Sequence, residues 1–392
     1  MKKANLGRGL ILLAVAGFFA YRYWQLGNPF YIVCILVFAV VSLLSFSDKL
    51  VAQWQNVGFN LGISLFFLDL VFAELNLTDL TGALVEANYW MLIPVTILIC
   101  IHIYFRTLRW QWLLKPMGEV PFWPAFRALV IGIAANTVLP ARAGEFLRAY
   151  VIGRSTGISK TGAFATLVVE RVFDGLTILL MLLVVVILGT RDTRLQTFGT
   201  VGGIFYIGVL LALILFILKR DAVDVLVKQR LSGDLAEIIL ELIDGFSSGL
   251  AILKNPRQLA MVVLWNMFTW VVVPISIWAT LLAFDFGAPI PWQTPTLMLP
   301  ALGIALSVPG APGGVGLFQA AVKLTMDITY TDLPKSVNFN EVVAAASIVI
   351  HLSQFGPEVI MGLFSFLFEG LSTQDIQAGR QMTVDKAAGS VE

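Results

Sequence analysis

Eight stretches of this sequence are each long and apolar enough to cross a lipid bilayer as a helix. A bilayer core of about 30 Å needs about 20 mostly apolar residues per helix. The candidate spans are residues 8–25, 29–46, 59–75, 88–108, 162–188, 201–218, 259–284 and 341–368. Because 58% of the 392 residues are hydrophobic and only 13% are charged, an ordinary soluble protein is excluded. We expect an all-α, polytopic membrane bundle of about eight transmembrane helices.

Two further apolar stretches are interrupted in the middle by helix breakers. Residues 126–153 are broken at Pro140 and residues 296–323 at Pro309, and glycines follow each proline. Proline removes a backbone donor and glycine frees φ, so neither stretch can run as one continuous helix. Irregular backbone at membrane depth is tolerated only inside protein or beside water. We therefore expect two re-entrant helical hairpins.

The distribution of basic residues predicts which side of the membrane each loop faces. If both broken stretches return to their own side, the cytoplasmic segments carry 18 Lys and Arg and the external loops carry five. For the second hairpin this criterion discriminates only weakly between a re-entrant and a spanning path. We expect a multi-pass protein of the cell membrane with both termini cytoplasmic.

The order span, span, broken hairpin, span occurs twice, in residues 59–188 and again in 201–368. The first copy begins inside and the second outside, which predicts an inverted repeat of the kind found in transporters. The second copy includes an amphipathic strap within residues 219–258. Two extra spans and a linker in residues 1–56 precede the repeats, and residues 371–392 form a polar tail expected to be disordered.

Three charges lie at the break of the first hairpin: Arg142, Glu145 and Arg148. An intramembrane charge is costly and normally faces a cavity or a partner. Gly144 would begin the second half-helix, whose N–H groups and positive dipole end form an anion site together with Arg142. In the alternative interpretation, an Arg142–Glu145 or Glu145–Arg148 pair only fixes the hairpin. We favour recognition of a phosphate.

The second break carries no charge but is rich in glycine, at Gly313, Gly314 and Gly316. Backbone amides at such a half-helix start can approach a phosphate closely. Tight helix packing through small residues would give the same composition. The presence of an arginine-bearing hairpin in the other repeat favours the ligand-binding alternative.

The predicted span 162–188 contains a charged group, formed by Glu170, Arg171 and Asp174 within about one helical turn. Such a group must line polar space, as a proton or lipid-headgroup relay or as a salt-bridged lock between bundle halves. Asp69 and His102 are single polar residues on apolar helices and are expected to be satisfied internally. The candidate gating positions are Pro140, Pro309, His351 and Pro357.

Two arginines lie at the end of the fourth predicted span, Arg106 and Arg109, ahead of Trp110 and Trp112. We expect them at the cytoplasmic interface, where arginine snorkels and aromatic residues form a belt.

Several kinds of chemistry have no signature in the sequence. No group of Cys, His or carboxylate residues has metal-ligand spacing, and no nucleotide-binding loop, nucleophile elbow or dinucleotide fingerprint is present. The net charge of +1 gives no basic surplus for nucleic acid. We expect no metal, no cofactor, no catalytic residue and no nucleic-acid partner, and a membrane lipid as the binding partner.

The segment from Asn136 to Ala149, followed by Val169 to Gly175, resembles the family of lysylphosphatidylglycerol-synthase transmembrane regions, also called flippase-like domain proteins. Further segments similar to that family, in its usual order, are Arg106–Trp110, Phe246–Leu250, Pro309–Gly316 and His351–Gly362. The resemblance covers about residues 57–370 and leaves the first two spans outside.

The resemblance implies a domain that translocates or handles lipids. It also implies that the site residues include Arg142, Gly144 and Glu145 of the hairpin, together with the charged group of Glu170, Arg171 and Asp174. The family's aminoacyltransferases append a large soluble catalytic domain, whereas only a short polar tail follows Phe368 here.

We therefore expect a non-enzymatic, flippase-like transporter of an anionic lipid, whether a phospholipid, an aminoacylated lipid, a glycolipid or a polyprenyl-phosphate lipid. Two alternatives stay open. One is an integral membrane transferase with Glu145 or Glu170 as general base, and the other is an accessory subunit of a separately encoded lipid synthase or glycosyltransferase.

Overall fold

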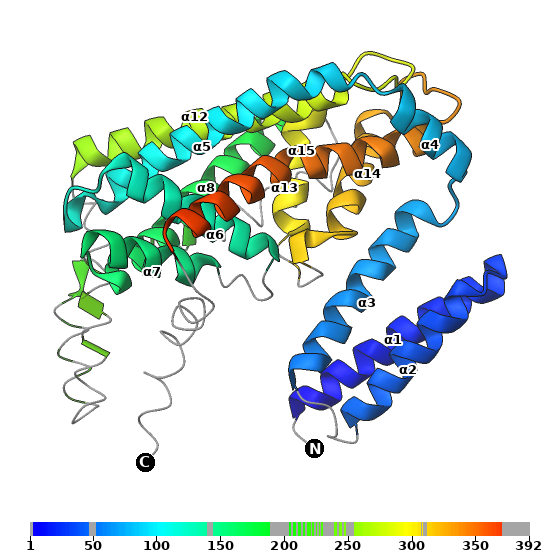
Figure 1. Cartoon of the computed structure of the whole chain (residues 1–392), viewed down its shortest axis with the longest axis horizontal. Helices are drawn as coiled ribbons and strands as arrows, with labels where there is room; N and C mark the ends of the chain where they lie inside the picture. Colours follow the sequence, from blue (N-terminus) through cyan, green and yellow to red (C-terminus); the bar gives the residue numbers. More distant parts are fainter. Residues whose placement is uncertain are drawn as a thin grey trace. The chain divides into compact units, whose positions relative to one another are not determined.

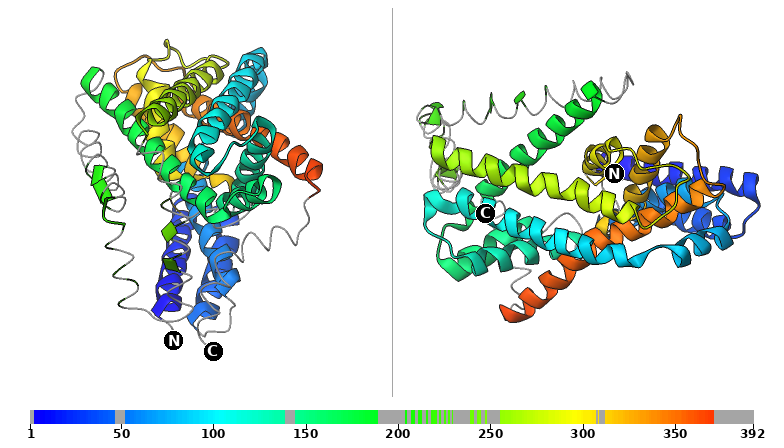
Figure 2. Two further views of the ribbon diagram at one scale, coloured as in Figure 1. Left: turned by 90° about the vertical axis from the view of Figure 1, so that its left-hand side faces the viewer. Right: turned by 90° about the horizontal axis from the view of Figure 1, so that it is seen from above.

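The computed structural model is helical, as expected for an all-α membrane protein (Figure 1, Figure 2). It describes residues 3–46, 52–138, 144–188, 255–306, 308 and 312–370, together with separate positions between 204 and 247. No β-strand occurs among these residues. The chain divides into two compact units, which are described one at a time.

The first unit comprises Met1–Ala87, Phe284–Pro289 and Ala301–His351. Its helices are α1 (Lys3–Leu26), α2 (Phe30–Phe46), α3 (Ala52–Phe72), α4 (Leu77–Glu86) and α14 (Leu317–Thr329), with the short 3-10 helix η5 (Pro312–Gly314). Figure 1 shows α1, α2 and α3 side by side, and α14 also packs on α3.

The second unit comprises Asn88–Ala283, Ile290–Pro300 and Leu352–Glu392. Its helices are α5 (Leu92–Leu114), α6 (Phe122–Val138), α7 (Gly144–Thr156), α8 (Lys160–Leu188) and α12 (Pro256–Leu281), with the 3-10 helices η1 (Tyr89–Met91) and η2 (Lys115–Met117). Two helices have residues in both units, α13 (Gln293–Ala305) and α15 (Phe339–Phe368). α5 packs along α12, and α6 and α7 form a helical hairpin that packs on α5 and α8.

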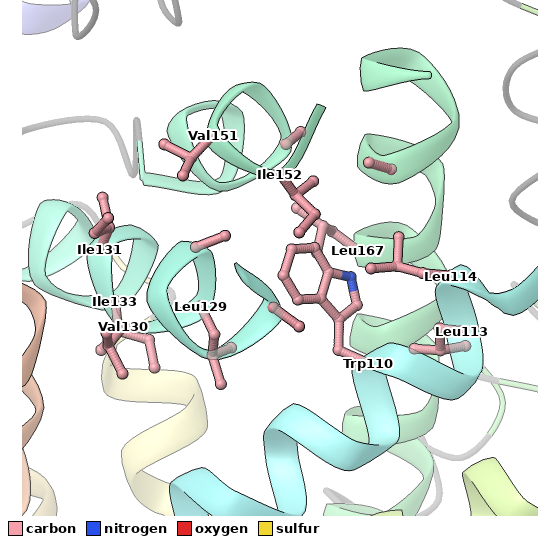
Figure 3. Close-up of a cluster of buried hydrophobic side chains, with 14 of the residues drawn as sticks. Trp110, Leu113, Leu114, Leu129, Val130, Ile131, Ile133, Val151, Ile152 and Leu167 are labelled. Carbon is pink, nitrogen blue, oxygen red and sulfur yellow. The ribbon is translucent and has the colours of Figure 1, made fainter. Parts of the chain in front are cut away.

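An apolar core holds α5, α6, α7 and α8 together (Figure 3). Trp110 of α5 is fully buried there, and Figure 3 shows its ring among Leu129 of α6, Ile152 of α7 and Leu167 of α8. A buried tryptophan contributes a large contact area to such a core. The core therefore fixes the hairpin against the helices that carry the charged side chains described below.

Glycines allow the helices around this hairpin to approach closely. A Cβ atom on Gly144 would collide with the carbonyl oxygen of Gly132, and one on Gly362 of α15 would collide with the carbonyl oxygen of Val130. Both contacts involve backbone, which cannot move aside as a flexible side chain can. α7, which begins at Gly144, thus returns tightly along α6.

The predicted count of eight spans is not confirmed. Among the described residues, four helices are long and apolar enough to cross a membrane, or five if the bent pair Val57–Phe72 and Leu77–Glu86 counts as one span. That pair bends by 85°, α2 is only 17 residues long, and most of 201–218 lies outside the described residues. α8 has 29 residues but is not among these helices. The chain is nonetheless a multi-pass membrane protein by its helices.

The inverted repeat is likewise not confirmed and stays a prediction, as do the domain boundaries at residues 56 and 370. The amphipathic strap lies outside the described residues except at separate positions and where α12 begins, and the polar tail over 371–392 lies wholly outside them.

Candidate functional site

Glu170 of α8 lies at the centre of a buried group of charged side chains in the second unit. Arg148 of α7 donates to both of its carboxylate oxygens, from Nη1 to Oε1 at 3.1 Å and from Nη2 to Oε2 at 3.0 Å. From α5, Nη2 of Arg109 lies 3.1 Å and Nη2 of Arg106 lies 3.4 Å from Oε1. Arg109, Arg148 and Glu170 are at most 2% exposed. Arg171 of α8 also places Nη2 3.4 Å from Oε1, so one carboxylate gathers four arginines from three helices.

Arg148 is held from its other side by the apolar core. Its guanidinium carbon lies 3.8 Å from the ring centroid of Trp110, a cation–π contact. The indole Nε1 of Trp110 in turn donates to Thr166 Oγ1 at 3.0 Å. The tryptophan thus links the packing of Figure 3 to the orientation of the arginine.

Asp174, one turn after Glu170, extends the charged group to α12. Arg109 Nη1 donates to its Oδ1 at 2.5 Å, and Trp270 Nε1 donates to the same oxygen at 2.8 Å. Asn266 of α12 accepts a hydrogen bond from Arg109 and donates to Thr177 Oγ1 at 2.5 Å. Four helices, α5, α7, α8 and α12, therefore meet at these polar side chains.

Glu145 and Arg171 form the outer edge of the group. Arg171, whose side chain is 47% exposed, places Nη2 3.1 Å from Glu145 Oε1. Asn136 of α6 donates to the same oxygen at 3.4 Å, and its own Oδ1 accepts the N–H of Gly144 at 2.8 Å. The first amide of α7, which we expected to face an anion, is therefore occupied by Asn136.

We call these seven residues the arginine cluster: Arg106, Arg109, Glu145, Arg148, Glu170, Arg171 and Asp174. Among the residues that the structure describes, four guanidinium groups face three carboxylates in this cluster, so one positive charge is left over there. The buried Nε atoms of Arg106, Arg109 and Arg148 have no hydrogen-bond partner within the described part of the chain. Since guanidinium groups only donate, the cluster has spare donors and lacks acceptors.

The structure brings most of the predicted site residues of the first repeat together, with two corrections. Arg106 and Arg109 do not snorkel at the interface, because α5 continues to Leu114 and turns both side chains inward toward Glu170. The Glu145–Arg148 pair of the alternative interpretation does not form either, because Arg148 bonds Glu170 and Glu145 faces Arg171.

The remaining residues of the first break, Pro140 and Arg142, lie outside the described residues, so their predicted roles stay predictions.

Sequence reasoning missed Asn266 and Trp270 of α12 as cluster partners. Asn266 is a single polar residue in the middle of an apolar span and is 1% exposed. Such a residue marks polar space inside a bundle, and this signal was available from the sequence.

The glycine turn of the second break lies in the first unit. Gly313, Gly314 and Gly316 have φ values of 72°, 72° and 89°, in the left-handed region that glycine adopts without strain. A Cβ atom on Gly316 would also collide with the carbonyl oxygen of Ser64 on α3. Helix packing therefore accounts for Gly316, whereas anion binding by Gly313 and Gly314 stays a prediction.

The gating positions of the second half have local partners as well. The N–H of Gly316 donates to Gln319 Oε1 at 2.7 Å, and Gln319 Nε2 lies 3.0 Å from Nδ1 of His351. Pro357 lies inside α15, which continues through it. Pro309 is outside the described residues. These contacts do not test gating, so the gating role of His351, Pro309 and Pro357 stays a prediction.

Comparison with known proteins places these features in a family. A sequence profile described as the lysylphosphatidylglycerol synthase TM region matches residues 56–362. The chain is 22% identical to UPF0104 membrane protein MJ1595 of Methanocaldococcus jannaschii, over 78% of this chain and 92% of that protein. No solved structure shows a significant match.

A second relative corrects one expectation. The chain is 24% identical to Glycosyltransferase AglD of Haloferax volcanii, over 74% of this chain and 50% of that protein, so it spans about half the relative's length. The expectation that an enzymatic role is excluded was therefore wrong, because a relative bears the name of a transferase. With more than three quarters of its length matched, this membrane protein belongs to the lysylphosphatidylglycerol synthase TM region family.

Proposed function

We propose that this chain binds the phosphate-bearing headgroup of an anionic membrane lipid at the arginine cluster and, like a flippase, handles that lipid across the bilayer. The observation that carries the proposal is that the buried Nε donors of Arg106, Arg109 and Arg148 have no acceptor among the residues that the structure describes. A buried donor without a partner costs about 1–3 kcal/mol, and more when it is charged. A phosphate offers several acceptor oxygens, and its charge-assisted bonds to arginine are strong.

The competing interpretation is a salt-bridged lock that only holds α5, α7, α8 and α12 together. A lock would be expected to match donors to acceptors, since an uncompensated buried charge is strongly destabilising. The left-over positive charge and the spare donors favour a site that is completed by an anion. Arg142, five residues before Leu147 of the core, is proposed as a further contact to the same headgroup.

Lipid binding by purified protein tests the proposal. Arg106 is the informative residue because its side chain is 17% exposed and because Glu170 keeps Arg109, Arg148 and Arg171 when Arg106 is replaced. Arg106→Gln should weaken binding of dioctanoyl phosphatidylglycerol about tenfold, or about 1.4 kcal/mol. Arg127→Gln is the matched control, since Arg127 pairs with Glu369 in the same unit but outside the cluster. If wild type and both variants bind the lipid with equal affinity, the arginine cluster only holds the helices together and does not bind the headgroup.

A second candidate function is lipid-linked glycosyl transfer, favoured by the relative named as a glycosyltransferase. The headgroup at the cluster would then be a lipid phosphate that accepts or carries a sugar, acted on by this chain or by a separately encoded transferase. Glu170 is enclosed by four arginines, whereas Glu145 has a partly exposed side chain and is the better candidate for a general base.

Mass spectrometry of the lipid separates the two functions. Purified protein is incubated with a polyprenyl-phosphate lipid and activated sugar donors. A mass increase that Glu145→Gln abolishes would establish transfer, and Arg127→Gln should leave it unchanged. An unaltered lipid mass, combined with movement of a labelled anionic lipid in proteoliposomes, would support transport instead.

The proposed orientation has both termini in the cytoplasm, on the basis of the basic residues of the loops. Single cysteines are introduced after Cys34 and Cys100 have been replaced, and intact cells are treated with an impermeant thiol reagent. A cysteine at Ser155, near the end of α7, should stay unlabelled. External labelling there would contradict a hairpin that returns to its own side.

A further inference from the structure

His102 of α5 and Glu358 of α15 form a second buried polar pair in the second unit. Both are less than 10% exposed, and Nε2 of His102 lies 4.0 Å from Oε1 of Glu358. Nδ1 of His102 lies 3.1 Å from the carbonyl oxygen of Thr269 on α12. The expectation that His102 is satisfied internally is thus confirmed for one of its ring nitrogens.

The hydrogen bond to Thr269 locates one of the protons of this pair. A carbonyl oxygen only accepts, so Nδ1 of His102 carries a proton and donates it to Thr269. Nε2 then faces the Glu358 carboxyl group either with a lone pair or with a second proton. No residue in the described part of the chain donates a hydrogen bond to Glu358. Two lone pairs facing each other would repel, so the contact between Nε2 and Oε1 is favourable only when one of the two atoms carries a proton.

The charged groups around the pair come mainly from α5. Arg106 follows His102 by one helical turn and Arg109 by about two, so all three share a face of α5. Arg106 in turn donates to Glu170, so it lies between the turn of α5 that carries His102 and the arginine cluster. Asp174 of α8 is bonded by Arg109, on the same face of α5, and by Trp270 of α12.

The other neighbouring helices contribute no free charge to the pair. α12 presents neutral groups, the carbonyl of Thr269 and the hydroxyl of Ser276, which donates to Gln354 at 3.2 Å. α6, which packs on α15 at Gly362, carries Arg127, but that arginine pairs with Glu369. Arg106 is therefore the charged residue that connects this pair to the arginine cluster.

We propose that His102 and Glu358 together hold one exchangeable proton inside the helical bundle, and that Arg106 couples this proton to anion binding at the arginine cluster. The first part stands on the pair alone, and the coupling rests on the proposed function. With one proton the pair is neutral overall, whether the proton is on nitrogen or on oxygen. Without it the pair is negative and compensates the charge of Arg106.

The direction of the coupling follows from charge balance. An anionic headgroup on the arginine cluster neutralises Arg106, which removes the charge that stabilised the deprotonated pair. Binding of the anion therefore favours uptake of a proton from water by Glu358 or His102. For a coupling of one proton, the apparent Kd rises by up to about tenfold per pH unit above the range in which the pair is protonated.

Infrared difference spectroscopy of the protein in lipid nanodiscs, titrated with acid and base, tests the proton site itself. We expect a protonated-carboxyl band that is lost in Glu358→Gln, shifted in His102→Gln, and unchanged in the control Glu341→Gln, which changes another glutamate of α15. Spectra that neither Glu358→Gln nor His102→Gln alters would overturn the proposal. If one of these two variants folds poorly, the spectrum of the other still decides the assignment of the band.

Calorimetric titration with dioctanoyl phosphatidylglycerol in two buffers of different ionisation enthalpy tests the coupling. This lipid is suitable because its phosphodiester does not titrate near neutral pH. Wild type and Glu341→Gln should take up a fraction of a proton on binding, and Glu358→Gln should take up none. Binding without proton uptake in wild type would overturn the coupling. Failure of wild type to bind the lipid would instead overturn the proposed function, and the infrared result would still decide the proton site.

Discussion

The ion pairs that join α1 to α3 in the first unit differ in composition from the arginine cluster of the second. Arg22 donates from Nε to Asp69 at 2.7 Å and from Nη1 to Glu74 at 3.2 Å, and Tyr31 donates to the other oxygen of Asp69 at 2.5 Å. There one guanidinium meets two carboxylates, so acceptors are in excess. In the arginine cluster donors are in excess, and three buried Nε atoms lack partners among the described residues.

The difference shows that an intramembrane ion pair does not by itself mark a functional site. The group around Asp69 is closed, because the side chains of α1 and α2 satisfy the carboxylate from both sides. It confirms the expectation that Asp69 is satisfied internally. The balance of donors and acceptors, rather than the presence of charge, is what distinguishes a lock from a place for a ligand.

The largest expected effect comes from removing the central carboxylate of the cluster. Glu170→Gln leaves Arg106, Arg109 and Arg148 close together without their shared counter-charge, and should lower the free energy of unfolding by about 3–5 kcal/mol. Thermal unfolding in detergent measures this loss. Asp69→Asn, the matched change in the other group, should cost less, because Arg22 keeps Glu74. Equal losses would remove the distinction between the two groups.

A smaller effect is expected from the arginine at the break of the hairpin. Arg142→Ala should weaken binding of dioctanoyl phosphatidylglycerol about tenfold, since it removes one charged phosphate contact. Thermal stability should stay near that of wild type, because Glu145 keeps Arg171 and Asn136 as partners. The double variant Arg142→Ala/Glu145→Ala should bind as weakly as the single variant. If this double variant is stable and binds as well as wild type, Arg142 is no ligand.

The smallest effects on lipid binding should appear at groups that only hold helices in place. Arg22→Gln removes an ion pair whose side chains are only 11% and 5% exposed, but Tyr31 still donates to Asp69, so the change should cost about 1–3 kcal/mol of stability with no change in lipid affinity. Unfolding curves and the lipid titration check the two parts. A fall in lipid affinity would mean that the closed group also serves binding.

Asn136→Ala should cost about 1 kcal/mol of stability, because it removes the side chain that accepts the N–H of Gly144 at the start of α7. The freed amide is then available to an anion, so lipid affinity should be retained or raised. A loss of affinity with unchanged stability would show that Asn136 itself contacts the headgroup.

The sequence predicted the helical class, the break of the first hairpin and the charged group of α8, because apolar length, proline and intramembrane charge are local signals. It did not predict the partners of those charges. Arg109 was assigned to the interface since it follows a span of ordinary length, whereas α5 continues to Leu114 and keeps it inside. Which arginine reaches Glu170 depends on how four helices pack, and no local pattern encodes that.

Asp69 is bonded by side chains of α1 and α2, and both helices precede the part of the chain that matches the family, which begins at residue 56. A shortened protein lacking residues 1–51 would expose this carboxylate on α3 after removing both Arg22 and Tyr31. In hydrocarbon such a charge would draw water or a detergent cation to the helix, or drive two copies to associate. A shortened protein intended for structure determination therefore also needs Asp69→Leu. The surface of α3 that α1 and α2 covered is then apolar and can contact lipid tails.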